Sequence, residues 1–110
     1  METTTSEVQI IEVKDRELSG PGAMRLLQEW DSLLRLAPRL TIVDLSRVRF
    51  IDSLAVSCLL RLARQATGRS RLVLVGLSRY ARTVAEVTHL DEIVEIAEDV
   101  AAAKALAAAA

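Results

Sequence analysis

Residues 41–76 read TIVDLSRVRFIDSLAVSCLLRLARQATGRSRLVLVG, and this stretch decides the fold class. Two near-continuous apolar runs, within 39–46 and 71–76, are typical of strands covered on both faces of a sheet. Between them, the apolar pattern over 53–67 predicts a helix that Gly68 stops. A strand, a helix and a second strand in this order predict a parallel β-α-β unit.

The rest of the chain continues the alternation of strands and helices. We expect a single strand before the first helix, over 8–13. Pro21 lies in the first turn of that helix, which runs to about Ala37 and is ended by Pro38. The later elements are a helix over 77–90 with Ser78 as its N-cap, a short strand within 91–96 and an Ala-rich helix over 98–110. The order predicts an α/β domain with a small, mostly parallel sheet of four to five strands and about four helices.

Length and composition indicate one domain over residues 1–110, with a polar segment at 1–7 that we expect to be disordered. A net charge of −1 gives no bulk attraction to nucleic acid or anionic lipid. No apolar run reaches the ~20 residues that span a bilayer, and the first residues do not resemble a secretory signal. Cys58 is the only cysteine, so an internal disulfide is impossible. These features predict a cytoplasmic protein without membrane insertion or direct contact with nucleic acid.

The residues needed for enzyme chemistry are sparse. The one histidine, His89, and Cys58 fall on different predicted elements, so we expect no metal site. Gly-rich phosphate loops are absent, and we expect no cofactor. Ser53 lacks the flanking glycines of a hydrolase nucleophile, and His89 suits a helix C-terminus. Asp44 and Asp52 lack the further acids and the lysine of a receiver-type phosphoacceptor site. The sequence therefore favours a protein that is not an enzyme and makes a Ser53–His89 hydrolase the weakest hypothesis.

Ser53 has two interpretations that the residues alone leave open. Asp52 or Ser53 could simply cap the helix, which is worth ~1 kcal/mol. The second interpretation rests on a narrow polar stripe, because four polar residues recur at helical spacing: Ser53, Ser57, Arg61 and Arg64. We expect Val56 and Leu60 to form a partly exposed apolar border beside this stripe, which suits a docking surface. A phosphoryl group on Ser53 would place charge in that surface and expel a partner.

A family resemblance joins these features. The chain has Asp-Leu-Ser at 44–46, Asp-Ser at a helix start, the strand LVLVG at 72–76 and the ending LDEIVEI at 90–96. This pattern resembles a STAS domain of the anti-sigma factor antagonist type, over about residues 8–106. The segment that follows Asp-Ser in this family usually contains a glycine. Here the segment is Leu54, Ala55 and Val56, without glycine, which is more similar to the stressosome scaffold members.

The resemblance implies a STAS fold and a phosphorylation-switched binding module. The unphosphorylated form would bind an anti-sigma factor or a serine/threonine switch kinase; the kinase would phosphorylate Ser53 and a phosphatase would reverse this. The implied partner-binding residues are Asp52, Ser53, Leu54, Val56, Ser57, Leu60 and Arg61. Arg47 and Arg49 would lie near them. The alternative is a STAS subunit of a lipid-transport ABC system without a phospho-switch. A homodimer or a larger assembly stays open.

Overall fold

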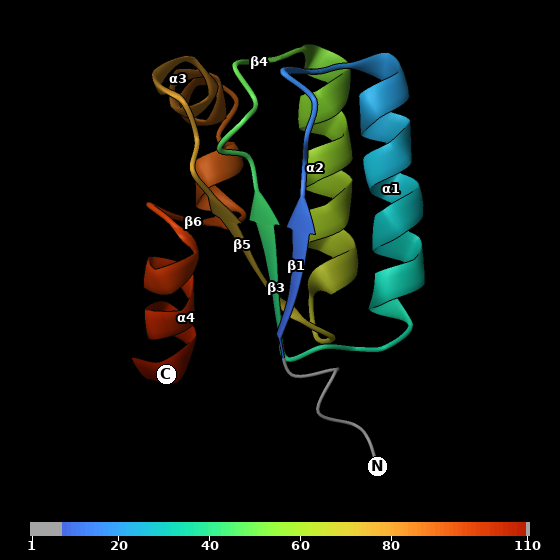
Figure 1. The fold of residues 1–110 in the computed structure, drawn as a ribbon, viewed down its shortest axis with the longest axis vertical. Coiled ribbons are helices and arrows are strands. Elements are labelled where there is room, and N and C mark those ends of the chain that lie inside the picture. The colour runs from blue at the N-terminus through green and yellow to red at the C-terminus, as the bar shows by residue number, and fades with distance from the viewer. Residues whose placement is uncertain (1–7, 110) are drawn as a thin grey trace.

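The structure, a computed structural model, describes residues 8–109. The segment expected to be disordered, 1–7, lies outside the described residues, as does the last residue of the predicted Ala-rich helix. The described chain has the predicted α/β architecture. Figure 1 shows a sheet with a helix pair on one side and a single C-terminal helix on the other.

The main sheet is four-stranded and entirely parallel. Its strands are β1 (Val8–Glu12), β3 (Leu40–Asp44), β5 (Arg71–Val75) and β6 (Glu95–Ala97), in the order β1-β3-β5-β6. β3 and β5 are almost fully buried, as their continuous apolar runs predicted. The stretch 41–76 therefore forms the expected β-α-β unit at the centre of the sheet.

Helices cover the two faces of this sheet. The helices α1 (Gly20–Leu34) and α2 (Ser53–Ala66) pack on the face that carries Ile11, Val43 and Leu74. The helix α4 (Val100–Ala109) packs on the opposite face, against a smaller cluster that includes Ile42 and Val73. Neighbouring residues of one strand thus contribute to different cores, because successive side chains point to opposite faces.

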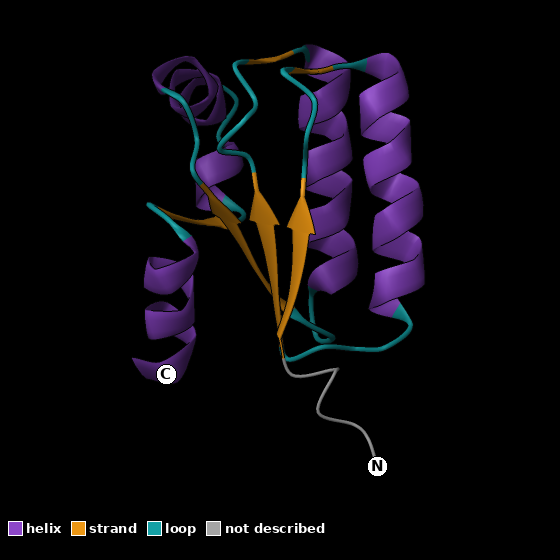
Figure 2. Ribbon diagram, viewed as in Figure 1, coloured by secondary structure: helices purple, strands orange, loops and turns teal. Residues whose placement is uncertain are grey.

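The sequence analysis missed two short strands. β2 (Glu17–Leu18) and β4 (Phe50–Ile51) pair in parallel and form a separate two-stranded sheet. The expectation of a single strand before the first helix was therefore wrong. Two residues are too few to show a periodic pattern, and the pairing depends on a contact between segments more than thirty positions apart. In Figure 2 the loops that follow β1 and β3 pass through these short strands to the N-terminal ends of α1 and α2.

Helix boundaries differ from the predictions where the backbone turns left-handed. α1 ends at Leu34 rather than near Ala37, because Ala37 has φ 46° and redirects the chain before Pro38. The helix α3 (Arg79–Val87) is shorter than the predicted 77–90, and a short 3-10 turn, η2 (Leu90–Glu92), follows a left-handed His89. The predicted N-cap of α3 is confirmed: the Ser78 hydroxyl accepts a hydrogen bond from the Ala81 N–H at 3.1 Å.

Candidate functional site

The junction between β4 and α2 holds Ser53 at the carboxyl edge of the strands, where open α/β sheets bind their ligands. The β2–β4 pairing fixes this junction. Ile51 and Leu18 are buried against the core, and the Asp52 N–H donates a hydrogen bond to the Leu18 carbonyl at 3.3 Å. The two-stranded sheet therefore determines where α2 begins.

Asp52 is the residue that caps α2. Its backbone is extended, and its Oδ1 accepts a hydrogen bond from the Ala55 N–H at 2.8 Å. The Asp52 carbonyl accepts the Val56 N–H at 3.0 Å, which begins the intrahelical ladder. The capping interpretation thus applies to Asp52 and not to its neighbour.

Ser53 is left exposed in the first turn. Within residues 8–109 its hydroxyl makes no hydrogen bond. Because it is not needed for the cap, the hydroxyl is available to react with or contact another molecule. The rest of the predicted polar stripe is exposed as expected, at Ser57, Arg61 and Arg64.

The apolar border of the stripe differs from the prediction. Val56 is only 5% exposed and packs in the main core, so its expected partial exposure was wrong. Leu60 is half-buried and packs against the same core. Leu54, by contrast, is 49% exposed beside Ser53 and supplies the apolar surface instead. Helical spacing placed Val56 beside the stripe but could not show that this side of α2 packs into the main core.

An exposed aromatic pair at the same end of the molecule was also missed. The rings of Phe50 in β4 and Tyr80 in α3 meet edge to face, with centroids 5.4 Å apart. Both side chains are about half exposed. The Ser78 hydroxyl donates to the Arg49 carbonyl at 3.3 Å and ties the two segments together. Phe50 directly precedes the junction in sequence, but nothing in the sequence signalled its contact with α3.

Neither His89 nor Cys58 makes a hydrogen bond with the Ser53 hydroxyl within residues 8–109. His89 is exposed, and its Nδ1 lies 2.9 Å from Oε2 of Glu92. This hydrogen bond and the charge of Glu92 raise the pKa of His89 above its ordinary value. Cys58 is buried, and burial raises the pKa of its thiol, which opposes formation of a nucleophilic thiolate. Within the described residues, no group of three or more His, Cys, Asp or Glu side chains could hold a metal ion.

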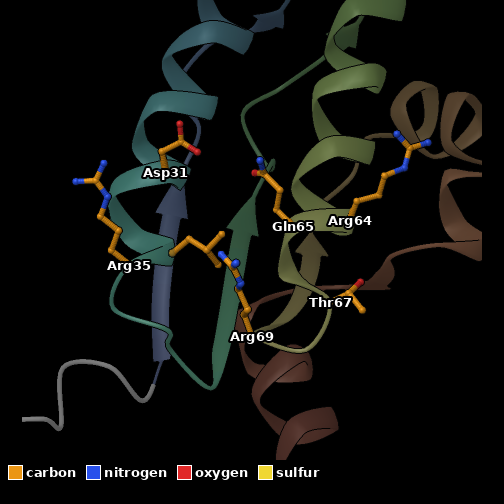
Figure 3. Close-up of a pocket in the computed structure, with 7 residues that line it drawn as sticks. Asp31, Arg35, Arg64, Gln65, Thr67 and Arg69 are labelled. Atoms are coloured by element: carbon orange, nitrogen blue, oxygen red, sulfur yellow. The ribbon is translucent and has the colours of Figure 1, made fainter.

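A hollow of about 480 Å³ lies at the other end of the helix pair, between the C-terminal ends of α1 and α2 (Figure 3). Trp30 lies fully buried in α1 and donates its indole N–H to Oε1 of Gln65 in α2 at 2.9 Å. This bond fixes the two helices at the end remote from Ser53. Three arginines line the hollow, and sequence reasoning did not single it out.

Comparison with known proteins identifies the fold family. The family model described as "Mlab, STAS domain" matches residues 4–95, which is most of the chain. The chain belongs to the STAS domain family. No curated protein matches it. The resemblance to a STAS domain, read from the Asp-Leu-Ser, Asp-Ser and LDEIVEI motifs, is thereby confirmed.

Solved STAS structures share the fold at low sequence identity. A candidate anti-sigma factor antagonist from Thermotoga maritima superimposes with a TM-score of 0.78 at 18% identity, covering 90% of this chain and 87% of its own. The anti-sigma factor antagonist SpoIIAA in its unphosphorylated form gives 0.70 at 21% identity, covering 89% and 86%. A sulfate transporter family protein from Wolinella succinogenes gives 0.76 at 18% identity, covering 93% and 85%. The same fold therefore occurs in proteins of different roles.

No helix among residues 8–109 of this STAS domain is long and apolar enough to cross a membrane. The candidate site consists of a capped helix start with a free hydroxyl, a half-exposed leucine and an aromatic pair nearby. Such a surface can bind a protein and can accept a phosphoryl group.

Proposed function

We propose that this STAS domain is a cytoplasmic anti-sigma factor antagonist, a binding module rather than an enzyme, whose partner binding is switched by phosphorylation of Ser53. The observation that carries the proposal is the free Ser53 hydroxyl beside a helix cap made by Asp52 alone. A serine that capped the helix would have to give up its hydrogen bond when phosphorylated. Ser53 has no such bond to lose, so the modification leaves the domain folded.

The electrostatics of the helix start favour a reversible switch. The N–H groups of Ser53 and Leu54 have no acceptor within residues 8–109, and they lie at the positive end of the helix dipole. A phosphoryl group of about −1.5 to −2 charges is tolerated there in the isolated domain. In a complex the same group would carry its water shell into contact with the half-exposed Leu54. Desolvating that charge is costly, so the phosphorylated form releases its partner.

The absence of the glycine that usually follows Asp-Ser helps to decide which branch of the STAS family the chain resembles. Of the three residues after Ser53, Ala55 and Val56 are buried and change only the core. Leu54 alone alters the surface that a partner meets. A stressosome-scaffold role is supported by this one exposed side chain, and we include it as a form of the proposed function.

The test is a pull-down from native lysate with the wild type and matched variants. Ser53→Ala should retain an anti-sigma factor or serine/threonine kinase, and Ser53→Asp should lose it. Ser32→Asp places the same charge on an exposed position of α1, outside the expected partner-binding residues, and serves as the control that should keep the partner. Equal capture by Ser53→Asp and wild type would refute the switch. A phosphatase that restores binding after treatment with kinase and ATP would complete the cycle.

A second candidate is a STAS subunit of a lipid-transport ABC system. One observation favours it: the family model that matches residues 4–95 is named for Mlab. In that role the domain would bind a permease or its ATPase constitutively. Capture of a permease or transport ATPase by wild type, Ser53→Ala and Ser53→Asp alike would support this candidate over the first.

A further inference from the structure

The hollow at the C-terminal ends of α1 and α2 has an unusual charge balance. It is lined by Asp31, Leu34, Arg35, Arg64, Gln65, Thr67 and Arg69. Its arginines come from three segments: the end of α1, the last turn of α2 and the loop before β5. The single carboxylate among seven lining residues leaves a formal charge of about +2, although the whole chain carries −1.

None of the three arginines has an ion-pair partner within residues 8–109. Arg35, Arg64 and Arg69 are all exposed and make no salt bridge there, whereas Arg25 and Arg71 are each paired with an acid. A cation near a helix C-terminus complements the helix dipole, which accounts for each arginine taken singly. The helix dipole does not explain why three arginines surround one hollow that contains a single carboxylate. Their mutual repulsion is relieved when an anion binds between them.

The centre of the hollow offers oriented donors. Because the Gln65 Oε1 accepts the Trp30 indole N–H, the amide NH₂ of Gln65 remains free to donate. Figure 3 shows Arg69 reaching up between the two helices, with Arg35 and Arg64 extending outward on either side. The outer two side chains are exposed and unpaired, so they can turn inward at the cost of rotamer entropy alone.

We propose that this hollow binds a small molecule carrying a diphosphate group. Its volume of about 480 Å³ lies within the ~300–1,000 Å³ of small-molecule sites. Guanidinium forks pair with phosphate oxygens through two parallel hydrogen bonds. Once Arg35 and Arg64 turn inward to join Arg69, three forks from three segments would match the several oxygens of a diphosphate, whereas one planar carboxylate could engage only one or two. The Asp31 carboxylate also lines the hollow and could accept a hydrogen bond from a hydroxyl or amine in the organic part of such a ligand.

The proposal is independent of Ser53, because the hollow lies at the opposite end of α2. A bound diphosphate would bridge the end of α1, α2 and the loop before β5. Since a ligand that binds only the folded state stabilises it by mass action, the melting temperature should rise with diphosphate concentration.

The test is titration calorimetry on the full chain with inorganic pyrophosphate, ADP, inorganic phosphate and acetate. We expect pyrophosphate and ADP to bind with a dissociation constant below about 1 mM, and phosphate and acetate to bind at least tenfold more weakly. Tighter binding of ADP than of pyrophosphate would assign the ligand as an organic diphosphate. Equal binding would assign it as free diphosphate.

Variants decide whether binding occurs in the hollow. Arg69→Ala and Arg64→Ala should each weaken pyrophosphate binding at least tenfold, while Arg69→Lys keeps the charge and loses less. Arg82→Ala removes an exposed arginine from α3 and is the control. The unliganded melting temperature of each variant checks that it is folded. Equal losses in Arg82→Ala and Arg69→Ala, or no detectable pyrophosphate binding by the folded wild type, would overturn the proposal.

Discussion

Replacing Asp52 and Ser53 separately tests how the start of α2 is built. Asp52→Ala removes the oxygen that accepts the Ala55 N–H at 2.8 Å, and the loss of such a cap costs about 1 kcal/mol. Ser53→Ala removes an exposed hydroxyl that makes no hydrogen bond within residues 8–109, and alanine favours helix. Its effect on the free energy of unfolding should stay within about 0.5 kcal/mol.

The difference is measurable by thermal unfolding. An unfolding entropy of ~2.1 cal/mol/K per residue gives about 0.2 kcal/mol/K for a domain of this size, so the Asp52→Ala cap loss lowers the melting temperature by about 5 °C. Asp52→Asn retains the capping oxygen and should lose about 1 °C or less. Urea unfolding at 25 °C gives the same comparison as a free energy. If Ser53→Ala lowered the free energy of unfolding as much as Asp52→Ala, Ser53 would be the cap. Its hydroxyl would then not be free for phosphorylation, and the proposal would fail.

Three further changes probe the core, the backbone and the surface charges. Leu59→Ala should lower the free energy of unfolding by about 3 kcal/mol in urea, because the side chain is 1% exposed; a loss below about 1 kcal/mol would contradict its place in the core. Gly76→Ala should destabilise by more than about 2 kcal/mol and by more than Gly68→Ala. Both glycines have positive φ, but a Cβ at Gly76 would lie 2.8 Å from the Cβ of a serine in the β3–β4 loop, and one at Gly68 meets nothing within 4 Å. The hydrogen bond that the His89 Nδ1–H donates to Glu92 raises the pKa of His89, so its small stabilisation is complete below pH 6.5 and is lost as pH rises through the raised pKa. An NMR titration should show that pKa falling in Glu92→Gln, and an unchanged value would exclude the contact.

The parts of the fold that follow from local pattern were predictable. The apolar runs within 39–46 and 71–76 have the usual length of a buried strand and are too short for a helix. Their length and composition therefore predicted β3 and β5. β2 and β4 were not predictable, because each is two residues long and exists only through its pairing with the other. The early end of α1 depends on the positive φ of Ala37, a conformation that the sequence did not signal.

The site was predictable where a single helix determines it. Spacing alone placed Ser53, Ser57 and Arg61 on an exposed stripe. It failed for Val56, whose burial depends on how neighbouring elements pack around α2. The contact between Phe50 and Tyr80 joins β4 to α3 and required the tertiary structure. Features confined to one helix follow from periodicity, and features shared between elements do not.

The central claim is that Ser53 is the phosphoacceptor of a binding switch. The most direct measurement is to incubate the protein with its captured kinase partner and ATP, and to locate phosphate by mass spectrometry. We expect one phosphate, on Ser53, none on Ser53→Ala, and loss of the partner in proportion to phosphorylation. Phosphate on Ser57 in the Ser53→Ala variant, or a fully phosphorylated protein that still binds its partner, would contradict the claim.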